Sequence, residues 1–110
     1  LFEIPKESLK HAAEFMTITF KMKKAWLKRV PAIVHIDNTA RPQLVKEAKN
    51  PLFHQLLTEY KKQTGLPLMI NTSFNAHEEP IVCNPGEAIK SLEAGMIDVL
   101  AIGNFIVKRK

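Results

Sequence analysis

A helix bounded at both ends by sequence signals is the feature that most constrains the fold of this chain. Asn50 is a favourable N-cap residue, Pro51 suits the first helical position, and Gly65 favours a stop. Between them, apolar side chains recur at helical spacing, at Leu52, Phe53, Leu56, Leu57 and Tyr60. The pattern predicts an amphipathic helix over Pro51–Thr64.

The flanking patterns predict a second long helix and several strands. Asn84-Pro85-Gly86-Glu87 repeats the helix start, with Glu87 placed as in a capping box, and Gly95 ends a helix that reaches Glu93. The remaining expected elements are a short helix at Pro5–Phe15, a helical turn at Ala25–Val30, strands at Met16–Lys23, Ala32–Asp37, 66–74 and Val99–Val107 (interrupted at Gly103-Asn104), a turn at Asp37-Asn38 and an irregular edge segment at 39–45. This order is typical of an α/β domain in which helices pack on a mixed twisted sheet.

Charge and cysteine content narrow the classes of partner. The 110 residues carry a net charge of +5, concentrated at 21–29 and 108–110. The surplus fits an anionic partner and equally well a solvated surface. The single cysteine, Cys83, indicates a reducing, cytoplasmic setting, and its apolar neighbours favour a buried residue over a nucleophile. No apolar run approaches the ~20 residues that span a membrane, and because the chain begins at Leu1 we expect a piece of a longer protein.

Two polar segments carry side chains that could bind an anion. In "LPLMINTSFN" the strand expected at 66–74 runs into Asn71, Ser73 and Asn75, which would share one face. In "HIDNTARPQ" alternate residues would share a face if the extended geometry continued through the turn, namely His35, Asp37, Thr39, Arg41 and Gln43. A guanidinium beside hydroxyl and amide groups suits a phosphate or a carboxylate. Turn formation and solvation of an edge strand are the alternative explanations.

Other chemistries find less support in the sequence. His35, Asp37 and Ser73 are the residue types of a hydrolase triad, but no G-x-S-x-G elbow surrounds Ser73. The four histidines lack metal-ligand spacing, and the sequence contains no phosphate-binding glycine fingerprint. Nucleic-acid binding rests on charge alone, so we expect neither a nucleic-acid partner nor a membrane.

Three motifs together resemble one enzyme family. "PAIVHIDNTARPQLV", "NPLFHQLLTEYKKQTGLPLMINTSFN" and "EPIVCNPGEAI" are similar in order and spacing to the C-terminal region of the O-carbamoyltransferases, which include nodulation-factor and antibiotic carbamoyltransferases. The likeness extends from about Met16 to Val107. It implies that residues 1–110 are the C-terminal portion of a YrdC-like α/β domain, which uses carbamoyl phosphate and ATP with Mg²⁺ to form carbamoyl-adenylate. An N-terminal domain of the actin-like fold would then bind the acceptor hydroxyl and a metal.

The resemblance also implies roles for individual residues. Arg41 would contact the phosphate groups, and Asn71 and Ser73 would hold the nucleotide and carbamoyl phosphate; Arg41 and Ser73 are the catalytic candidates. Asn75 completes an S-x-N pattern. His35 and Thr39, from the motif that contains Arg41, complete the expected binding set.

The chain departs from the family pattern in two places. His77 and Glu78 stand where a basic residue and glycine are usual, and Asn38 replaces a glycine in "HIDN", where it can take the same left-handed turn. A Lys and Arg motif that supplies further phosphate contacts would precede Leu1, so we expect the fragment alone to be inactive. A basic nucleotide- or RNA-binding module without catalysis, and a lobe that packs on the rest of its own chain, are the alternative functions.

Overall fold

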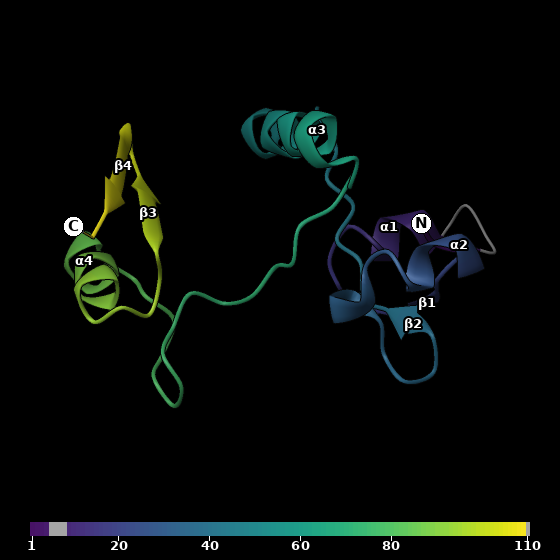
Figure 1. Ribbon diagram of the computed structural model, residues 1–110, viewed down its shortest axis with the longest axis horizontal. Helices are drawn as coiled ribbons and strands as arrows, with labels where there is room; N and C mark the ends of the chain where they lie inside the picture. Colours follow the sequence, from purple (N-terminus) through teal and green to yellow (C-terminus); the bar gives the residue numbers. More distant parts are fainter. Residues whose placement is uncertain (5–8, 110) are drawn as a thin grey trace. The chain divides into compact units, whose positions relative to one another are not determined.

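The computed structural model describes residues 1–4 and 9–109, and the chain forms two compact units, Leu1–Ile70 and Asn71–Lys110. Within the described residues there are four α-helices and four strands (Figure 1). The α/β class predicted from the sequence is therefore confirmed. The strands form two antiparallel two-stranded sheets, one in each unit, where the sequence predicted one mixed sheet.

The first unit contains a minimal sheet with short helices around it. Its elements are α1 (Leu9–Ala12), β1 (Phe20–Lys21), α2 (Lys24–Leu27), a 3₁₀ helix (Pro31–Ile33), β2 (Thr39–Ala40) and α3 (Pro51–Thr64). Phe20 pairs with Ala40 and Lys21 with Thr39. The predicted helical turn near Trp26 is confirmed as α2. Residues 5–8 of the helix expected at Pro5–Phe15 lie outside the described residues, and its later part forms α1 followed by a turn.

Two predicted strands of the first unit are wrong in extent or type. Met16–Lys23 is a strand only over β1, because Met16 takes a left-handed conformation (φ 55°) and β2 offers two residues for pairing. Ala32–Asp37 is not a strand, since Pro31 begins the 3₁₀ helix and a turn follows. That turn was predicted at Asp37-Asn38, and Asn38 has a φ of 63° there.

Helix α3 matches its prediction at both ends. The Asn50 side chain accepts a hydrogen bond from the Phe53 amide at 3.2 Å, and Gly65 (φ 74°) donates its amide to the Lys61 carbonyl at 2.8 Å. Its apolar stripe is largely uncovered, however, with Leu52 77% and Leu56 47% exposed. The helix ends are therefore fixed locally, while the stripe adds little to the core of the first unit.

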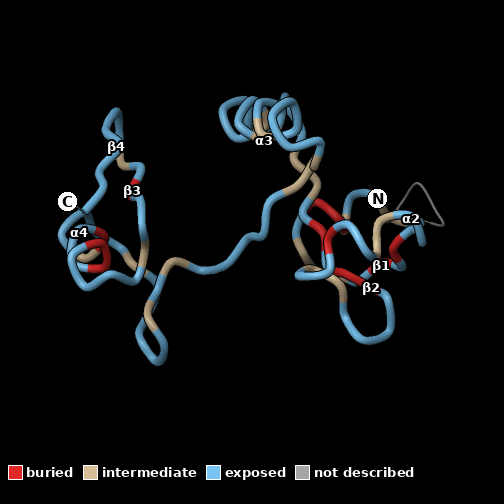
Figure 2. Tube along the Cα trace, viewed as in Figure 1, coloured by how far each residue is buried: buried red, intermediate tan, exposed pale blue. Residues whose placement is uncertain are grey.

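The core of the first unit lies beside its sheet (Figure 2). Met22, Val30 and Ala40 are buried together, and half-buried apolar side chains pack against them, among them Trp26 and Leu68. Leu66 and Leu68 thus contribute to this core without forming a strand. The strand expected at 66–74 is absent from the described residues, so that prediction is wrong in this structure.

The second unit packs one helix on a hairpin. It contains α4 (Pro85–Glu93), β3 (Val99–Ile102) and β4 (Phe105–Lys108), with Leu100 paired to Val107 and Ile102 to Phe105. Ala88, Leu92 and Leu100 form the buried cluster, with Phe74, Val82, Ile97 and Ile102 packed against it. The strand expected at Val99–Val107 is therefore a hairpin, because Gly103 (φ 55°) begins a two-residue turn.

The predicted helix start at Asn84 is confirmed. The Asn84 side chain accepts from the Glu87 amide at 3.0 Å, while the Glu87 carboxylate accepts from the Cys83 amide at 2.9 Å, one residue further back than in a capping box. The hydrogen bond from the Cys83 amide is the largest cause that lowers the pKa of Glu87. Nowhere in the described part of the chain is a helix both long and apolar enough to cross a membrane.

Candidate functional site

The "HIDNTAR" motif folds into a tight loop that leads into β2. The His35 amide donates to the Thr39 carbonyl at 2.8 Å, and the Asn38 amide donates to the His35 carbonyl at 2.9 Å. Inside the loop, Asp37 Oδ1 accepts from the Thr39 amide at 3.0 Å and from the Thr39 hydroxyl at 2.7 Å. The turn at Asn38 ends any extended geometry, so the alternate residues of the motif do not share one strand face as predicted.

The polar groups of this loop satisfy one another. Hydrogen bonds from the Thr39 hydroxyl and then from its amide lower the pKa of Asp37, which is therefore ionised at neutral pH. Since the single hydroxyl proton of Thr39 goes to Asp37, the His35 Nδ1 atom, 3.0 Å from the same oxygen, must carry its own proton when it donates there. The binding roles expected of His35 and Thr39 remain predictions, and Thr39 itself is buried.

Arg41 projects from a fixed piece of backbone. It lies between Ala40, which pairs with Phe20 and is 3% exposed, and Pro42, which is also buried. The Arg41 side chain is exposed, and within the described residues its guanidinium forms no ion pair. Its full charge is therefore available to an anion, and no internal contact has to be broken first.

The "NTSFN" segment begins the second unit and has no regular secondary structure. Asn71 and Ser73 are exposed, whereas Phe74 packs against the core. Asn75 closes the following loop, because its side-chain amide donates to the carbonyls of Ala76 (3.1 Å) and Glu79 (2.9 Å). The structure thus places Asn75 in a structural contact that the sequence did not indicate.

The six predicted site residues divide between the two units. His35, Thr39 and Arg41 lie together in the first unit, and Asn71, Ser73 and Asn75 follow one another in the second. The structure joins His35 to Thr39 by a hydrogen bond. The combination of Arg41 with Ser73 in one anion site remains a prediction.

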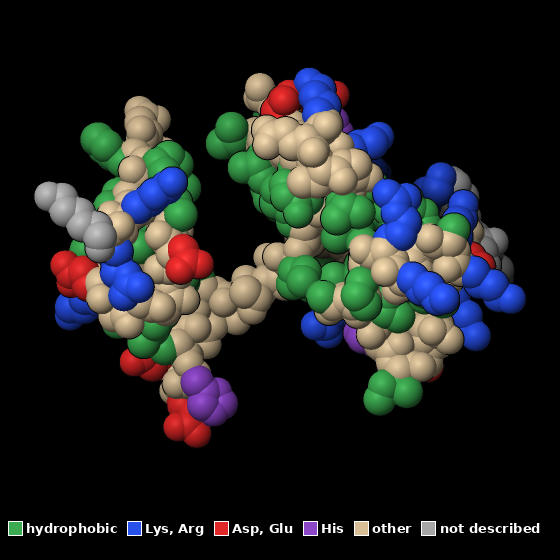
Figure 3. Space-filling model, in the orientation of Figure 1, with side chains coloured by type: hydrophobic (Ala, Val, Ile, Leu, Met, Phe, Trp, Pro, Cys, Tyr) green, Lys and Arg blue, Asp and Glu red, His purple; other side chains and the backbone are tan. Residues whose placement is uncertain are grey.

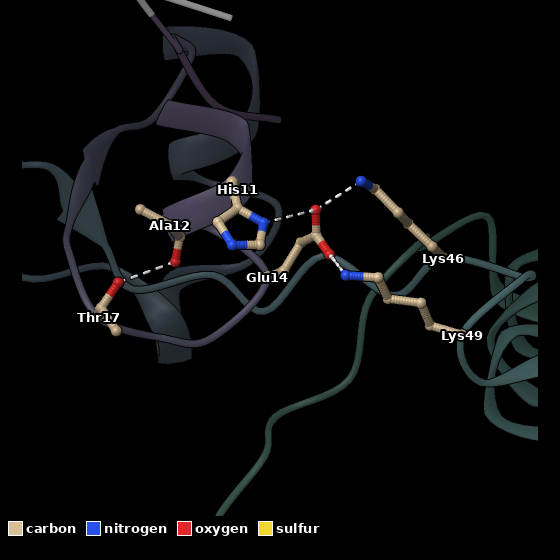
Figure 4. Close-up of polar contacts among 6 residues, drawn as sticks. All are labelled: His11, Ala12, Glu14, Thr17, Lys46 and Lys49. Carbon is tan, nitrogen blue, oxygen red and sulfur yellow. Dashed lines mark hydrogen bonds and ion pairs between the residues drawn. The ribbon is translucent and has the colours of Figure 1, made fainter. Parts of the chain in front are cut away.

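A buried ion cluster was missed by sequence reasoning. The Glu14 side chain is 4% exposed, and its Oε1 lies 2.5 Å from Lys46 Nζ while its Oε2 accepts a hydrogen bond from Lys49 Nζ at 2.7 Å (Figure 4). His11 Nδ1 lies 3.7 Å from Oε1. We call Glu14, Lys46 and Lys49 the Glu14 cluster; its hydrogen bonds from Lys46 and Lys49 hold the pKa of Glu14 at about 2. No local signal predicts it, because the partners are separated by more than thirty residues of chain.

A small pocket borders the Glu14 cluster. Its volume is about 120 Å³, and besides the cluster it is lined by Phe15, Gln43, Leu44, Val45, Asn50 and Phe53. The Lys49 ammonium also lies 5.6 Å from the centre of the Phe15 ring, within the range of a cation–π contact. The pocket thus joins the turn after α1 to the beginning of α3.

The structure also bears on the burial of Cys83, on metal binding and on the basic surface. Cys83 is exposed, so the prediction of a buried cysteine is wrong; it precedes the α4 cap, outside the apolar cluster of that unit. Within the described residues no group of three His, Cys, Asp or Glu side chains is placed to hold a metal ion. Lysine and arginine side chains gather on the surface of the first unit (Figure 3), where the Arg29 guanidinium lies 4.2 Å from the centre of the Trp26 ring.

Comparison with known sequences identifies the family. The sequence profile of the family described as "Carbamoyltransferase C-terminus" matches residues 2–109, so the chain belongs to that family. This confirms the resemblance read from the three motifs.

Similar proteins come from archaea and from nodulating bacteria. The chain is 44% identical over 110 residues to an uncharacterized protein of Methanocaldococcus jannaschii, a match over 100% of this chain and 17% of that protein. It is 35% identical over 109 residues to nodulation protein NolO of Bradyrhizobium diazoefficiens, covering 99% of this chain and 20% of the relative. It is 38% identical over 63 residues to nodulation protein U of Rhizobium tropici, covering 57% of this chain and 11% of that relative. The chain therefore spans a fifth or less of the length of these relatives.

Proposed function

We propose that this chain belongs to the part of a carbamoyltransferase that binds carbamoyl phosphate and ATP. In the full-length enzyme it contributes to forming carbamoyl-adenylate, which then carbamoylates a hydroxyl of an acceptor held by another domain. Membership of the carbamoyltransferase C-terminal family supports carbamoyl transfer as the general reaction. A cytoplasmic setting is consistent with ATP as a substrate and with a single cysteine in the chain.

The binding proposal rests on the anchored backbone and exposed guanidinium of Arg41. Its backbone is anchored by β2 on one side and by buried Pro42 on the other, while its guanidinium is exposed and has no ion-pair partner in the described chain. An arginine held in this way can bind a phosphate through two parallel hydrogen bonds.

The chemistry explains why such a group would be needed. Water first cleaves carbamoyl phosphate into carbamate and inorganic phosphate. A carbamate oxygen then attacks the α-phosphorus of ATP, a new oxygen–phosphorus bond forms, and pyrophosphate leaves with the electron pair of the broken bond. Negative charge develops on the phosphoryl oxygens during this step, and a preorganised cation stabilises it. In the proposal Arg41 supplies that cation, Mg²⁺ accompanies ATP, and Asn71 and Ser73 donate to the remaining oxygens.

The test is calorimetric titration of the full-length protein with carbamoyl phosphate and with Mg-ATP. We expect Arg41→Ala and Ser73→Ala each to weaken binding, and loss of the charged contact of Arg41 should weaken it roughly tenfold to a hundredfold. Arg41→Lys should recover only part of the loss, because an ammonium cannot form the bidentate pair.

Lys62→Ala is the matched control. Lys62 is an exposed lysine on α3, 2.6 Å from Glu59, so its removal changes the net charge equally without touching the motif. Equal affinities for Arg41→Ala and the wild type would contradict the proposed site, and equal losses in Arg41→Ala and Lys62→Ala would indicate a nonspecific effect of charge.

A further inference from the structure

The segment that follows Arg41 has no secondary structure to fix its path. Residues 41–46 are irregular and a turn at 47–49 precedes α3. The segment is held instead by contacts to the turn after α1. The Leu44 amide donates to the Ala13 carbonyl at 2.8 Å, and Lys46 and Lys49 reach back to the carboxylate of Glu14.

Glu14 is the central member of this attachment. Its side chain is 4% exposed, whereas those of Lys46 and Lys49 are 55% and 56% exposed, so the two ammonium groups reach from the solvent to a carboxylate that is fixed in the interior. Each carboxylate oxygen contacts one ammonium group, an arrangement that compensates a buried charge. Removing the charge of Glu14 weakens its contacts with both lysines at once, while removing either lysine leaves the contact with the other in place.

We propose that Glu14 is a positioning residue for Arg41, which it holds in its phosphate-binding orientation by fixing the segment Gln43–Asn50. The inference rests on the proposed function, because it assigns Glu14 a role in that same anion site. Arg41 lies between two attachments, the β2 pairing of Ala40 and the Ala13–Leu44 hydrogen bond, which the Glu14 cluster reinforces. If the second attachment is loosened, the Arg41 guanidinium samples a wider range of positions. A smaller fraction of the protein molecules then holds this guanidinium in the orientation that binds phosphate.

A double-mutant cycle in the full-length protein distinguishes positioning from general stabilisation. Glu14→Gln keeps the shape of the side chain and removes its charge. We expect it to weaken carbamoyl phosphate binding roughly threefold to tenfold, less than the effect of Arg41→Ala, because the guanidinium is still present. In the Arg41→Ala background the same change should alter affinity by less than about twofold, since there is no longer a group to position.

The matched control is Glu59→Gln. Glu59 also contacts a lysine, at 2.6 Å, but both side chains of that pair are more than half exposed and lie on α3. It should leave the affinity unchanged in both backgrounds. If Glu14→Gln does not fold, Lys46→Met removes one arm of the cluster and should give a smaller loss of affinity with the same dependence on Arg41.

The outcomes separate this inference from the proposed function. If Glu14→Gln weakens carbamoyl phosphate binding equally in the wild-type and Arg41→Ala backgrounds, the positioning role is wrong. It is also wrong if Glu14→Gln binds with normal affinity while Arg41→Ala binds weakly. Normal affinity in Arg41→Ala would refute the phosphate contact itself, and the positioning role with it. A loss that vanishes only in the Arg41→Ala background supports both.

Discussion

The buried carboxylate of Glu14 should remain ionised under conditions that protonate an ordinary glutamate. Hydrogen bonds from Lys46 and then Lys49 lower its pKa from 4.5 to about 2. At pH 3.5, a carboxyl group with a pKa of about 2 is roughly 3% protonated, whereas one with a pKa of about 4.5 is roughly 90% protonated. This difference is large enough to be read from a single pH point as well as from a full titration.

The measurement is a carbon NMR titration of the full-length protein labelled at the glutamate carboxyl carbon, with the Glu14 signal assigned by Glu14→Gln. We expect this signal to stay at its ionised position from pH 6 down to pH 3.5. Lys46→Met should raise the pKa more than Lys49→Met, since the contact with Lys46 is the larger cause of the shift. With both lysines replaced, the main causes of the shift are gone while burial still raises the pKa, which should therefore rise well above 2.

The same shift sets the direction of a pH effect on stability. A carboxyl group whose pKa is lower in the folded state stabilises the fold above its ordinary pKa, and the contribution is lost as the pH falls through the folded value. For Glu14 the loss should therefore occur between about pH 4.5 and pH 2. A wild-type Glu14 signal that titrates near pH 4.5 would refute the cluster, and so would identical titrations in the wild type and the double lysine variant.

Two further predictions test local geometry. Gly65 and Gly95 both have left-handed backbones (φ 74° and 76°), but a Cβ at Gly65 meets nothing within 4 Å whereas one at Gly95 would lie 2.5 Å from Arg109 Nη1. Each glycine-to-alanine change should thus destabilise by about 1–2 kcal/mol in thermal unfolding, because the end of the flexible Arg109 side chain can move away from a Cβ at Gly95; a larger loss in Gly95→Ala that disappears when Arg109→Ala is added would show that it cannot. Neutral His35 should carry its proton on Nδ1, and nitrogen NMR should show this tautomer population fall in Thr39→Val, whereas an unchanged population would exclude the hydrogen bond to the Thr39 hydroxyl.

The helices could be predicted from the sequence because their signals and their bonds are local. Asn50 and Gly65 each satisfy backbone groups within four residues, and Asn84 does the same for the start of α4. Such a bond needs no information from elsewhere in the chain. The position of the apolar stripe of α3 was correct for the same reason, although its exposure depends on distant residues.

The strands could not be predicted equally well, because a strand requires a partner. Met16–Lys23 alternates over eight residues, yet it pairs only near its end, where β2 and Phe2 lie alongside it. The strand predicted at 66–74 finds no partner among the described residues, and the half-buried Leu66 and Leu68 pack against the core without pairing. Alternation reports which side chains are apolar and says nothing about whether a second strand is present.

The candidate site shows the same division between local and distant information. The turn at Asn38 was predicted from the residue type, and the hydrogen bonds of Asp37 and Thr39 follow from their separation of two residues. The Glu14 cluster depends on chain segments that meet only after folding. A buried glutamate in the turn after a short helix gives no sequence signal that separates it from an exposed one.

The two anion-binding candidates differ in how much of their geometry is fixed before a ligand arrives. Arg41 follows a paired residue and precedes a buried proline, and the Glu14 cluster anchors the segment beyond it. Ser73 is exposed in a segment without regular secondary structure, although the Phe74 carbonyl beside it accepts a hydrogen bond from the Val82 amide at 2.8 Å. A contact of Ser73 with a ligand must therefore also offset the ordering of residues 71–73. The entropy lost when the segment becomes ordered therefore offsets part of the binding free energy that hydrogen bonds of Ser73 provide. We accordingly expect Arg41→Ala to weaken carbamoyl phosphate binding more than Ser73→Ala does. The reverse order in the calorimetric titration would mean that the "NTSFN" segment, rather than the "HIDNTAR" loop, is the preorganised half of the site.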